Sequence, residues 1–357
     1  NNALYLLYSS LLYLKKPFNT LAKVFNQKDS REEVQSIKDN AFVFYRPAFT
    51  WTKRVANGNL SNILKANDYN FRSFEKGFGR IHLIHAFVTF PGGYIAMKLA
   101  EKYKIPYMIT EEMSPFRPDI FMNLKHKIHE QVILPLRNAA KVIAVSPAAA
   151  QEISRYSGSP VSYIPNLVDE TFFIPPKSVA RQRKFYFFTL GRMVEQKGIP
   201  ILLEAISKLD NQNVLFRIGG DGEHLNQYKQ LSKALSIENI EWLGALDRTQ
   251  ARQHFQECNA FILPSLHESM GVVFAEAIAC GKPIIATKCG GPESIVNEDN
   301  GLLAEVGDSD DLAHKISWMI DHFDRYKPEI IRADFMNRFS QKVVGNQIME
   351  LYKKVMV

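Results

Sequence analysis

Short runs of β-branched and aromatic residues alternate along the chain with longer segments whose apolar residues recur at helical spacing. This alternation predicts parallel sheets whose strands are joined by crossover helices. In the first half, the predicted strands are residues 3–8, 41–46, 80–87, 106–110, 141–146 and 161–165, and the predicted helices are 92–103, 122–139 and 147–156.

A second series of the same kind begins at residue 185. Before it lies FFIPPKSVARQRK, residues 172–184, which contains two prolines and four basic residues. Proline ends regular elements, so this segment is the predicted linker. In the second half, the predicted strands are 185–191, 214–220, 240–244, 260–265, 283–287 and 301–306, and the predicted helices include 199–209, 310–320 and 339–356.

The two series predict two Rossmann-like, doubly wound α/β domains that face a cleft. We place the first at residues 1–175, the second at 184–335, and a C-terminal helix within 336–357. Ligands of open α/β sheets bind beyond the carboxyl ends of the strands. The residues that follow predicted strands are therefore the ones to search for chemistry.

Composition agrees with a globular α/β protein, since 46% of the 357 residues are hydrophobic and 23% are charged. Charge is uneven: residues 1–183 carry a net charge of +11, and residues 184–357 carry −4. A basic first half favours an anionic partner. The sequence has no nucleic-acid-binding motif, so we expect an anionic membrane surface or acceptor rather than nucleic acid.

The three cysteines, Cys258, Cys280 and Cys289, have no metal-ligand spacing and are too few for a disulfide framework. We therefore expect a cytoplasmic protein, peripheral at the inner face of the membrane. The sequence contains no run of 18 apolar residues, and its opening stretch lacks the basic region and cleavage site of a signal peptide. It does not begin with Met, and we expect an N-terminally incomplete first domain.

The most specific motif is HESMGVVFAEAIACGKPIIAT, residues 267–287, in which Glu268 and Glu276 stand eight residues apart. Glu268 follows a predicted strand, and Glu276 lies about one turn into a helix predicted to begin near Val272. The first N–H groups of a helix are a natural seat for phosphate, and Gly271 permits close approach to the backbone. A carboxylate one turn further suits ribose hydroxyls. Two ordinary glutamates on a solvated helix face are the alternative.

A second motif is TLGRMVEQKGI, residues 189–199, where a predicted strand ends at Gly191 and two cations follow. A guanidinium at Arg192 and an ammonium at Lys197 suit a diphosphate, through bidentate and point-charge contacts respectively. The alternative is a pair of surface cations without a ligand.

Two glycine-rich segments also follow predicted strands. GGDGEH, residues 219–224, is either a tight turn or a place beside a nucleobase, and it fails as a nicotinamide fingerprint because residue 225 is Leu. CGGPESI, residues 289–295, is either a plain loop or a backbone nest for the ligand.

Together these segments resemble the retaining glycosyltransferases of the GT-B fold, specifically glycosyltransferase family 4. The resemblance covers most of residues 80–320, and its strongest parts are GRMVEQKG, the Glu-x7-Glu pair and GGPESIV. It implies that Arg192, Lys197 and the backbone at Gly191, Gly271 and Val272 bind the donor diphosphate. It also implies that Glu276 holds the ribose, that Glu268 faces the transferred sugar, and that no cofactor or metal is required.

The first half resembles the family less closely. The first strand, glycine-rich loop and helix of the family are absent if residues 3–8 form its second strand. The family often carries His after the strand represented here by PYMIT, and this sequence has Glu112 there. His85, at the end of another predicted strand, is the other candidate for the sugar side of the cleft, with a structural role as its alternative.

The resemblance therefore implies a hexosyl- or related transferase (EC 2.4 class). It would move a sugar from a UDP- or GDP-linked donor to a glycan or lipid-linked acceptor in cell-envelope polysaccharide or glycolipid synthesis. The C-terminal helix would pack back toward the first domain. Three alternatives share the fold: a sugar-nucleotide epimerase, a phosphorylase, and an inactive binding module. The sequence contains no motif for the first two.

Overall fold

The computed structural model describes residues 33–38, 41–46, 48, 60–113, 116, 130–176, 184–210 and 213–356. The chain divides into two compact units. One consists of the chain up to Ile84 together with Tyr94–Ile105, and the other consists of His85–Gly93 and Pro106–Val357. The strand predicted at 3–8 and the first part of the helix predicted at 122–139 lie outside the described residues.

The described residues of the first unit form a β-hairpin and two helices. Strands β1 (Glu33–Lys38) and β2 (Ala41–Tyr45) pair antiparallel, and helices α3 (Leu60–Phe78) and α4 (Tyr94–Tyr103) pack together. The prediction of a parallel-sheet strand at 41–46 is therefore wrong. Only two residues separate the two strands, a connection too short for the crossover that a parallel pair requires.

The second unit contains two parallel sheets. The first has four strands in the order β3-β4-β5-β6. Their bounds are β3 Ile84–Phe87, β4 Tyr107–Glu111, β5 Lys141–Ala144 and β6 Val161–Tyr163, and α5 (Glu130–Asn138) and α6 (Pro147–Ser154) belong to the same half. The four strands occupy the predicted positions, although β3 starts four residues later than expected.

The second sheet has six strands in the order β12-β11-β10-β7-β8-β9. This is the Rossmann order, in which the first strand of the series, β7, lies in the middle beside the fourth, β10. The bounds are β7 Phe185–Leu190, β8 Val214–Gly219, β9 Ile240–Gly244, β10 Ala260–Ile262, β11 Ile284–Thr287 and β12 Gly301–Ala304. All six strands were predicted, and the two Rossmann-like α/β sheets confirm the predicted fold class.

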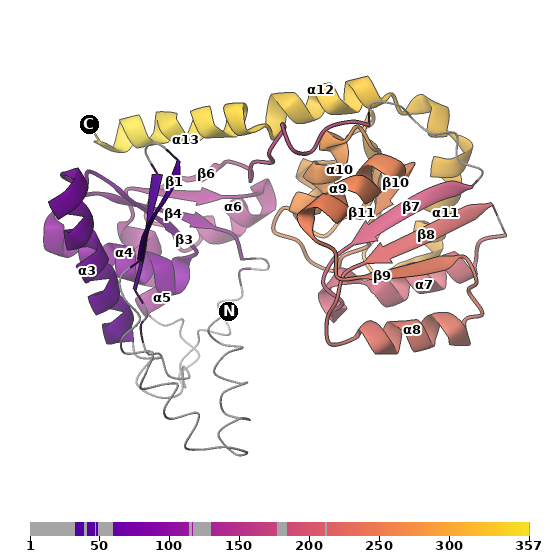
Figure 1. Cartoon of the computed structure of the whole chain (residues 1–357), viewed down its shortest axis with the longest axis horizontal. Helices are drawn as coiled ribbons and strands as arrows, with labels where there is room; N and C mark the ends of the chain where they lie inside the picture. Colours follow the sequence, from indigo (N-terminus) through magenta and orange to yellow (C-terminus); the bar gives the residue numbers. More distant parts are fainter. Residues whose placement is uncertain are drawn as a thin grey trace, which may run out of the picture. The chain divides into compact units, whose positions relative to one another are not determined.

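Helices cover both faces of the six-stranded sheet (Figure 1). Helices α7 and α8 lie on one face, and α9 and α10 lie on the opposite face. The α-helices that follow β7 in the chain are α7 Ile199–Ser207, α8 Leu225–Ala234, α9 Arg248–Glu257, α10 Val272–Ala279, α11 Ser309–Asp321, α12 Pro328–Arg338 and α13 Gln341–Met356. The domain boundary placed at 172–184 and the packing of the C-terminal helix stay predictions.

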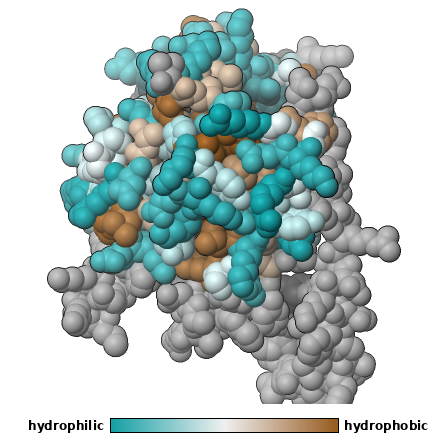
Figure 2. All heavy atoms as spheres, turned by 90° about the vertical axis from the view of Figure 1, so that its left-hand side faces the viewer, coloured by the Kyte–Doolittle hydropathy of each residue, from teal (hydrophilic) through white to brown (hydrophobic). Residues whose placement is uncertain are grey.

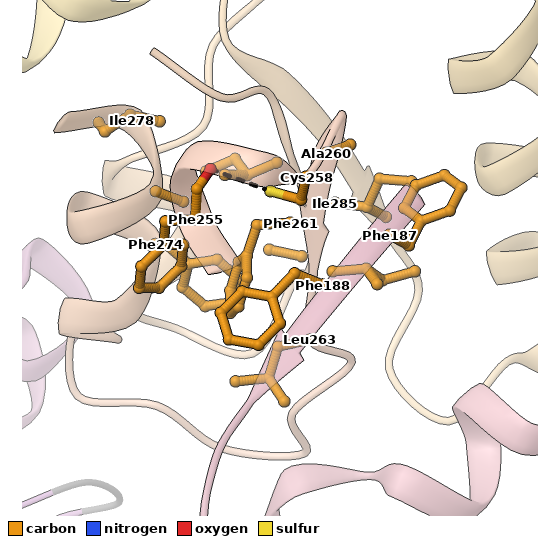
Figure 3. Close-up of a cluster of buried hydrophobic side chains, with 14 of the residues drawn as sticks. Phe187, Phe188, Phe255, Cys258, Ala260, Phe261, Leu263, Phe274, Ile278 and Ile285 are labelled. Carbon is orange, nitrogen blue, oxygen red and sulfur yellow. Dashed lines mark hydrogen bonds between the residues drawn. The ribbon is translucent and has the colours of Figure 1, made fainter. Parts of the chain in front are cut away.

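The core around the six-stranded sheet is aromatic. Phe187 and Phe188 on β7, Phe261 on β10 and Phe274 on α10 are all 0% exposed and belong to one cluster (Figure 3). Burying an aromatic side chain of this size contributes roughly 1.5–3 kcal/mol. The cluster ties β7, β10 and α10 together, and these are the three elements from which the candidate site is built.

Candidate functional site

The site lies at the switch point of the six-stranded sheet. In this sheet, β8 and β9 lie on one side of β7, whereas β10, β11 and β12 lie on the other side of β7. Connections from β7 and β10 therefore diverge to opposite faces and leave a crevice at the carboxyl ends of these two strands. The loop after β7 contains Arg192 and Lys197, and the loop after β10 contains Glu268.

Lys197 and Glu268 form an ion pair across this crevice. Lys197 Nζ lies 2.5 Å from Glu268 Oε1, and the two side chains are only 15% and 9% exposed. Ser265 Oγ donates a second hydrogen bond of 2.8 Å to the same oxygen. Among the described residues, Glu268 Oε2 accepts no hydrogen bond, so one carboxylate oxygen remains available to a ligand.

Backbone contacts hold the two loops in register. Leu266 N donates to Gln196 O at 2.8 Å, and Gln196 Nε2 donates to His267 O at 2.8 Å. Gly198 has φ +63°, and a Cβ there would lie 2.0 Å from Pro264 O. Only glycine therefore allows the loop after β7 to approach the loop after β10 so closely. The position of Lys197 against Glu268 is fixed by this approach.

Gly271 and Val272 begin α10 as predicted. Gly271 has φ +82°, and a Cβ there would lie 2.6 Å from Cδ2 of the buried Phe274. The helix starts at Val272, and Phe274 N donates to Gly271 O, so it is the N–H groups of Val272 and Val273 that have no intrahelical partner and point out of the positive end of the helix. These groups can bind a phosphate beside the Lys197–Glu268 pair.

Glu276 lies one turn into α10, as predicted, and it has no side-chain hydrogen bond to the described residues. Burial raises the pKa of Glu276 to about 7, and the positive charge of Arg248 opposes this rise only in part. A carboxyl with this pKa carries its charge for only part of the time near neutral pH. Hydrogen bonds from ligand hydroxyls would favour the ionised form.

The other donor-side candidates lie in the loop after β7. Arg192 is exposed, and within the part of the chain that the structure describes it has no ion pair. The aliphatic part of the Lys197 side chain packs over Gly191: a Cβ at Gly191 would lie 3.4 Å from Lys197 Cγ. Gly191 thus leaves room for Lys197 to lie across the end of β7.

The two glycine-rich segments pack against this site. In residues 219–224, a Cβ at Gly220 would lie 1.8 Å from Gly191 O, and Asp221 O accepts a hydrogen bond from Met193 N. The turn therefore braces the loop after β7, which favours the tight-turn interpretation. In residues 289–295, Gly291 N donates to Glu268 O at 3.1 Å, so this segment supports the loop of Glu268.

His85 is the second residue of β3 and not at the end of the strand as predicted, and it lies in the half of the second unit that holds the four-stranded sheet. Its Nε2 is 2.7 Å from Thr110 Oγ1, and its Nδ1 is 2.7 Å from Tyr352 Oη on α13. Burial lowers the pKa of His85, so the neutral ring prevails at pH 7. Both ring nitrogens are engaged, which fits the structural role left open above, and a catalytic role for His85 stays a prediction.

Glu112 follows β4, where the family often carries His. Its pKa is raised, because the surrounding protein removes part of its water and the neighbouring Glu111 repels its charge. Ser269 Oγ, in the loop of Glu268, donates a hydrogen bond to Glu112 O. A catalytic role for the Glu112 side chain stays a prediction.

Two positioning residues escaped the sequence analysis. Ser265 is 0% exposed, and its hydrogen bond holds the Glu268 side chain in place. Its position at the end of an apolar run, three residues before Glu268, is the sequence feature that could have indicated this role. Glu111 is 1% exposed and accepts hydrogen bonds from the backbone N–H groups of Thr89, Glu112 and Met113. It ties the loop after β4 to the segment after β3, and no sequence pattern indicated this.

No group of three or more potential metal ligands occurs among the described residues. In the same part of the chain, no helix is both long and apolar enough to cross a bilayer. The three cysteines are free. Metal independence and location in the cell stay predictions.

Two family models match consecutive parts of the chain, which together span residues 28–328. The model described as "Glycosyltransferase Family 4" matches residues 28–172, and the model described as "Glycosyl transferases group 1" matches residues 170–328. The second match contains every residue expected to bind the donor, namely Gly191, Arg192, Lys197, Gly271, Val272 and Glu276, and it also contains Glu268.

Individual proteins give the same result. An uncharacterized glycosyltransferase of Methanocaldococcus jannaschii, MJ1178, is 30% identical over 247 residues, which cover 68% of this chain and 66% of that one. The Bacillus subtilis protein TuaC, provisionally assigned as a teichuronic acid biosynthesis glycosyltransferase, is 26% identical over 88% of this chain and 79% of its own. The solved structure of Anabaena Alr3699/HepE in complex with UDP has a TM-score of 0.69 at 21% identity, covering 81% of this chain and 82% of that one.

Proposed function

We propose that this chain transfers a sugar from a nucleotide diphosphate sugar with retention of anomeric configuration. The premise is that the chain belongs to the group 1 glycosyltransferases of family 4 with the GT-B fold. The acceptor we propose is a glycan or lipid-linked glycan of the cell envelope. Support for the acceptor class comes from the similarity to TuaC, which is named for teichuronic acid synthesis. Support for a uridine donor comes from the UDP in the Alr3699/HepE structure.

One observation carries the proposal: the ion pair of Lys197 and Glu268 lies at the switch point of the sheet, and the loop of Glu268 leads directly into α10, which begins at Val272. The cations Lys197 and Arg192 and the first N–H groups of α10 would bind the two phosphates. As the bond between the anomeric carbon and the phosphate oxygen breaks, negative charge grows on the diphosphate and positive charge grows on the sugar. Lys197 and Arg192 stabilise the first charge, and Glu268 stabilises the second.

The acceptor supplies a hydroxyl that attacks the anomeric carbon from the face that the diphosphate leaves. The new bond joins the acceptor oxygen to the anomeric carbon, and the hydroxyl proton passes to an oxygen of the leaving diphosphate. Atoms and charge balance without a further reactant. Glu276 takes no part in this step, and it binds the ribose hydroxyls before and during the reaction.

The direct test is incubation of the protein with UDP-glucose, UDP-galactose, UDP-N-acetylglucosamine and GDP-mannose, with nucleotide diphosphate release as the readout. Release from one donor, increased by an added glycan acceptor, is the expected result. Conversion to another nucleotide sugar without release would indicate an epimerase, and binding without turnover of any donor would indicate an inactive module. Proton NMR of the product decides whether the anomeric configuration is retained.

Donor affinity should rise with pH, because burial holds the pKa of Glu276 at about 7. The ionised carboxylate accepts hydrogen bonds from the ribose, so the donor binds the deprotonated form better. The dissociation constant of UDP-glucose, whose diphosphate has no ionisation near neutrality, should fall between about pH 5.5 and about pH 8.5. Glu276→Gln should bind more weakly at high pH and remove this dependence. An unchanged slope in Glu276→Gln would assign it to another group.

Peripheral attachment to an anionic membrane remains a proposal. Its support is the net charge of +11 in residues 1–183, at about 1 kcal/mol for each basic residue close to an anionic leaflet. Flotation with anionic liposomes should recover the protein at low salt and lose it at high salt. Absence of binding at low salt would reject the proposal.

A further inference from the structure

The first compact unit contains a polar pocket that the proposed reaction does not use. It is an open surface pocket of about 270 Å³, and one wall is a face of α3. Asn62, Lys65, Tyr69 and Arg72 contribute from α3 at helical spacing, and Arg46 contributes from the residue that follows β2. Two alanines, Ala48 and Ala66, also line the pocket and leave room between the long side chains.

The pocket has a surplus of positive charge. Arg46, Lys65 and Arg72 line it, and none of the described residues that line it is acidic. Arg72 Nε lies 3.4 Å from Asp68 Oδ2, but the Asp68 carboxylate also binds Lys102 Nζ at 2.5 Å, so its charge is shared. Arg46 and Lys65 have no ion pair with any residue that the structure describes. Three cations around one hollow repel one another unless an anion lies between them.

Arg46 is held ready to bind. Its guanidinium carbon lies 3.6 Å from the centroid of the Tyr69 ring, a stacked arrangement that fixes the plane of the group. Stacking occupies the face of the guanidinium and leaves the N–H groups at its edge free to donate. Such a fork fits two oxygens of one phosphate, whereas Lys65 supplies a point charge and Asn62 a neutral donor.

We propose that this pocket binds a phosphate group. Two sources share this chemistry, namely the headgroup of an anionic lipid and a soluble phosphate compound. Exposed apolar side chains occur in the same unit, with Val43 41%, Tyr45 54% and Phe78 46% exposed. Figure 2, which views the molecule from the side on which α3 lies in Figure 1, shows apolar patches among mostly hydrophilic side chains. The proposal is independent of the donor, because the first unit contains none of the donor-side residues.

The test uses the full chain and the double variant Arg46→Gln/Lys65→Gln. The matched control is Lys76→Gln, which removes a charge from an exposed residue of α3 outside the pocket. Isothermal titration calorimetry with inorganic phosphate and pyrophosphate measures the soluble arm. Phosphatidylcholine vesicles with and without phosphatidic acid measure the lipid arm. Thermal unfolding of each variant confirms that it is folded.

The double variant should lose at least about tenfold in affinity, since it loses two charge-assisted contacts, and Lys76→Gln should stay close to the parent. Arg46→Lys keeps the charge without the fork and should lose part of the affinity. If the double variant loses binding to phosphatidic acid vesicles, the site is assigned to a lipid headgroup. If the loss is confined to the calorimetric titrations, the site is assigned to a soluble phosphate. Equal binding by parent and double variant, or an equal loss in Lys76→Gln, overturns the proposal.

Discussion

Replacement of Glu268 by Gln should lower kcat about 100-fold while leaving the donor KM within a few-fold of the parent, a loss of about 2.7 kcal/mol in the transition state. The amide keeps the shape of the side chain and the contact with Ser265 Oγ. It lacks the negative charge that opposes the positive charge growing on the sugar. Because this charge exists fully only in the transition state, its loss acts on turnover rather than on binding.

Steady-state kinetics on the donor found in the panel would measure this effect. Glu305→Gln is a matched control, since Glu305 is an exposed carboxylate of the same sheet half that pairs with Lys288 on the surface. It should leave kcat unchanged. If Glu268→Gln retained full turnover, its role beside the reacting sugar would be wrong, and Glu112 or His85 would become the next candidate.

Replacement of Lys197 by Ala should have two separate effects. Nucleotide diphosphate affinity should fall by roughly 1–3 kcal/mol, because a charge-assisted contact to phosphate is lost. Stability should also fall, by about 3 kcal/mol, because the buried Glu268 carboxylate loses its cation and keeps only Ser265. The side chains of Glu268 and Lys197 are 9% and 15% exposed, so water replaces little of the lost interaction.

Calorimetric unfolding and nucleotide titration separate the two effects. The double variant Lys197→Met/Glu268→Gln leaves no charge at this buried pair, so it should recover most of the lost stability without recovering affinity. Arg192→Ala provides the opposite control. Arg192 is exposed and has no ion pair among the described residues, so its loss should weaken binding and leave the unfolding temperature unchanged. Equal unfolding temperatures for Lys197→Ala and the parent would contradict a stabilising ion pair.

Much of the donor side was predictable from the sequence, because local patterns encode it. The apolar run 260–265 predicted β10, Gly271 predicted the start of α10, and the spacing of Glu268 and Glu276 placed one carboxylate in a loop and the other on the helix. Each of these depends on a few neighbouring residues, since hydrophobic periodicity and glycine conformation act over short stretches of chain. The alternation of strands and helices likewise determined the fold class.

The first half was less predictable, and the hairpin shows why. Residues 41–46 were correctly predicted as extended, but their partner β1 was not predicted, and the strand was placed in the wrong sheet. Extended structure follows from composition, whereas pairing depends on which strand is nearby. The role of Glu111 was missed because it also depends on which segments lie nearby in the fold. Two of its backbone partners are close to it in sequence, but the third, Thr89, lies 22 residues away.

The sequence by itself therefore determined the strands of the six-stranded sheet, the fold class and the identity of the charged residues after these strands, but not β1 or helix α3. Only the tertiary structure decided that Lys197 and Glu268, 71 residues apart, form one buried pair. The strand order that places β7 beside β10 is a long-range result of packing, and so is the approach of Gly198 to Pro264. The pKa of Glu276 was also beyond the sequence, because burial sets it and burial is a property of the folded chain.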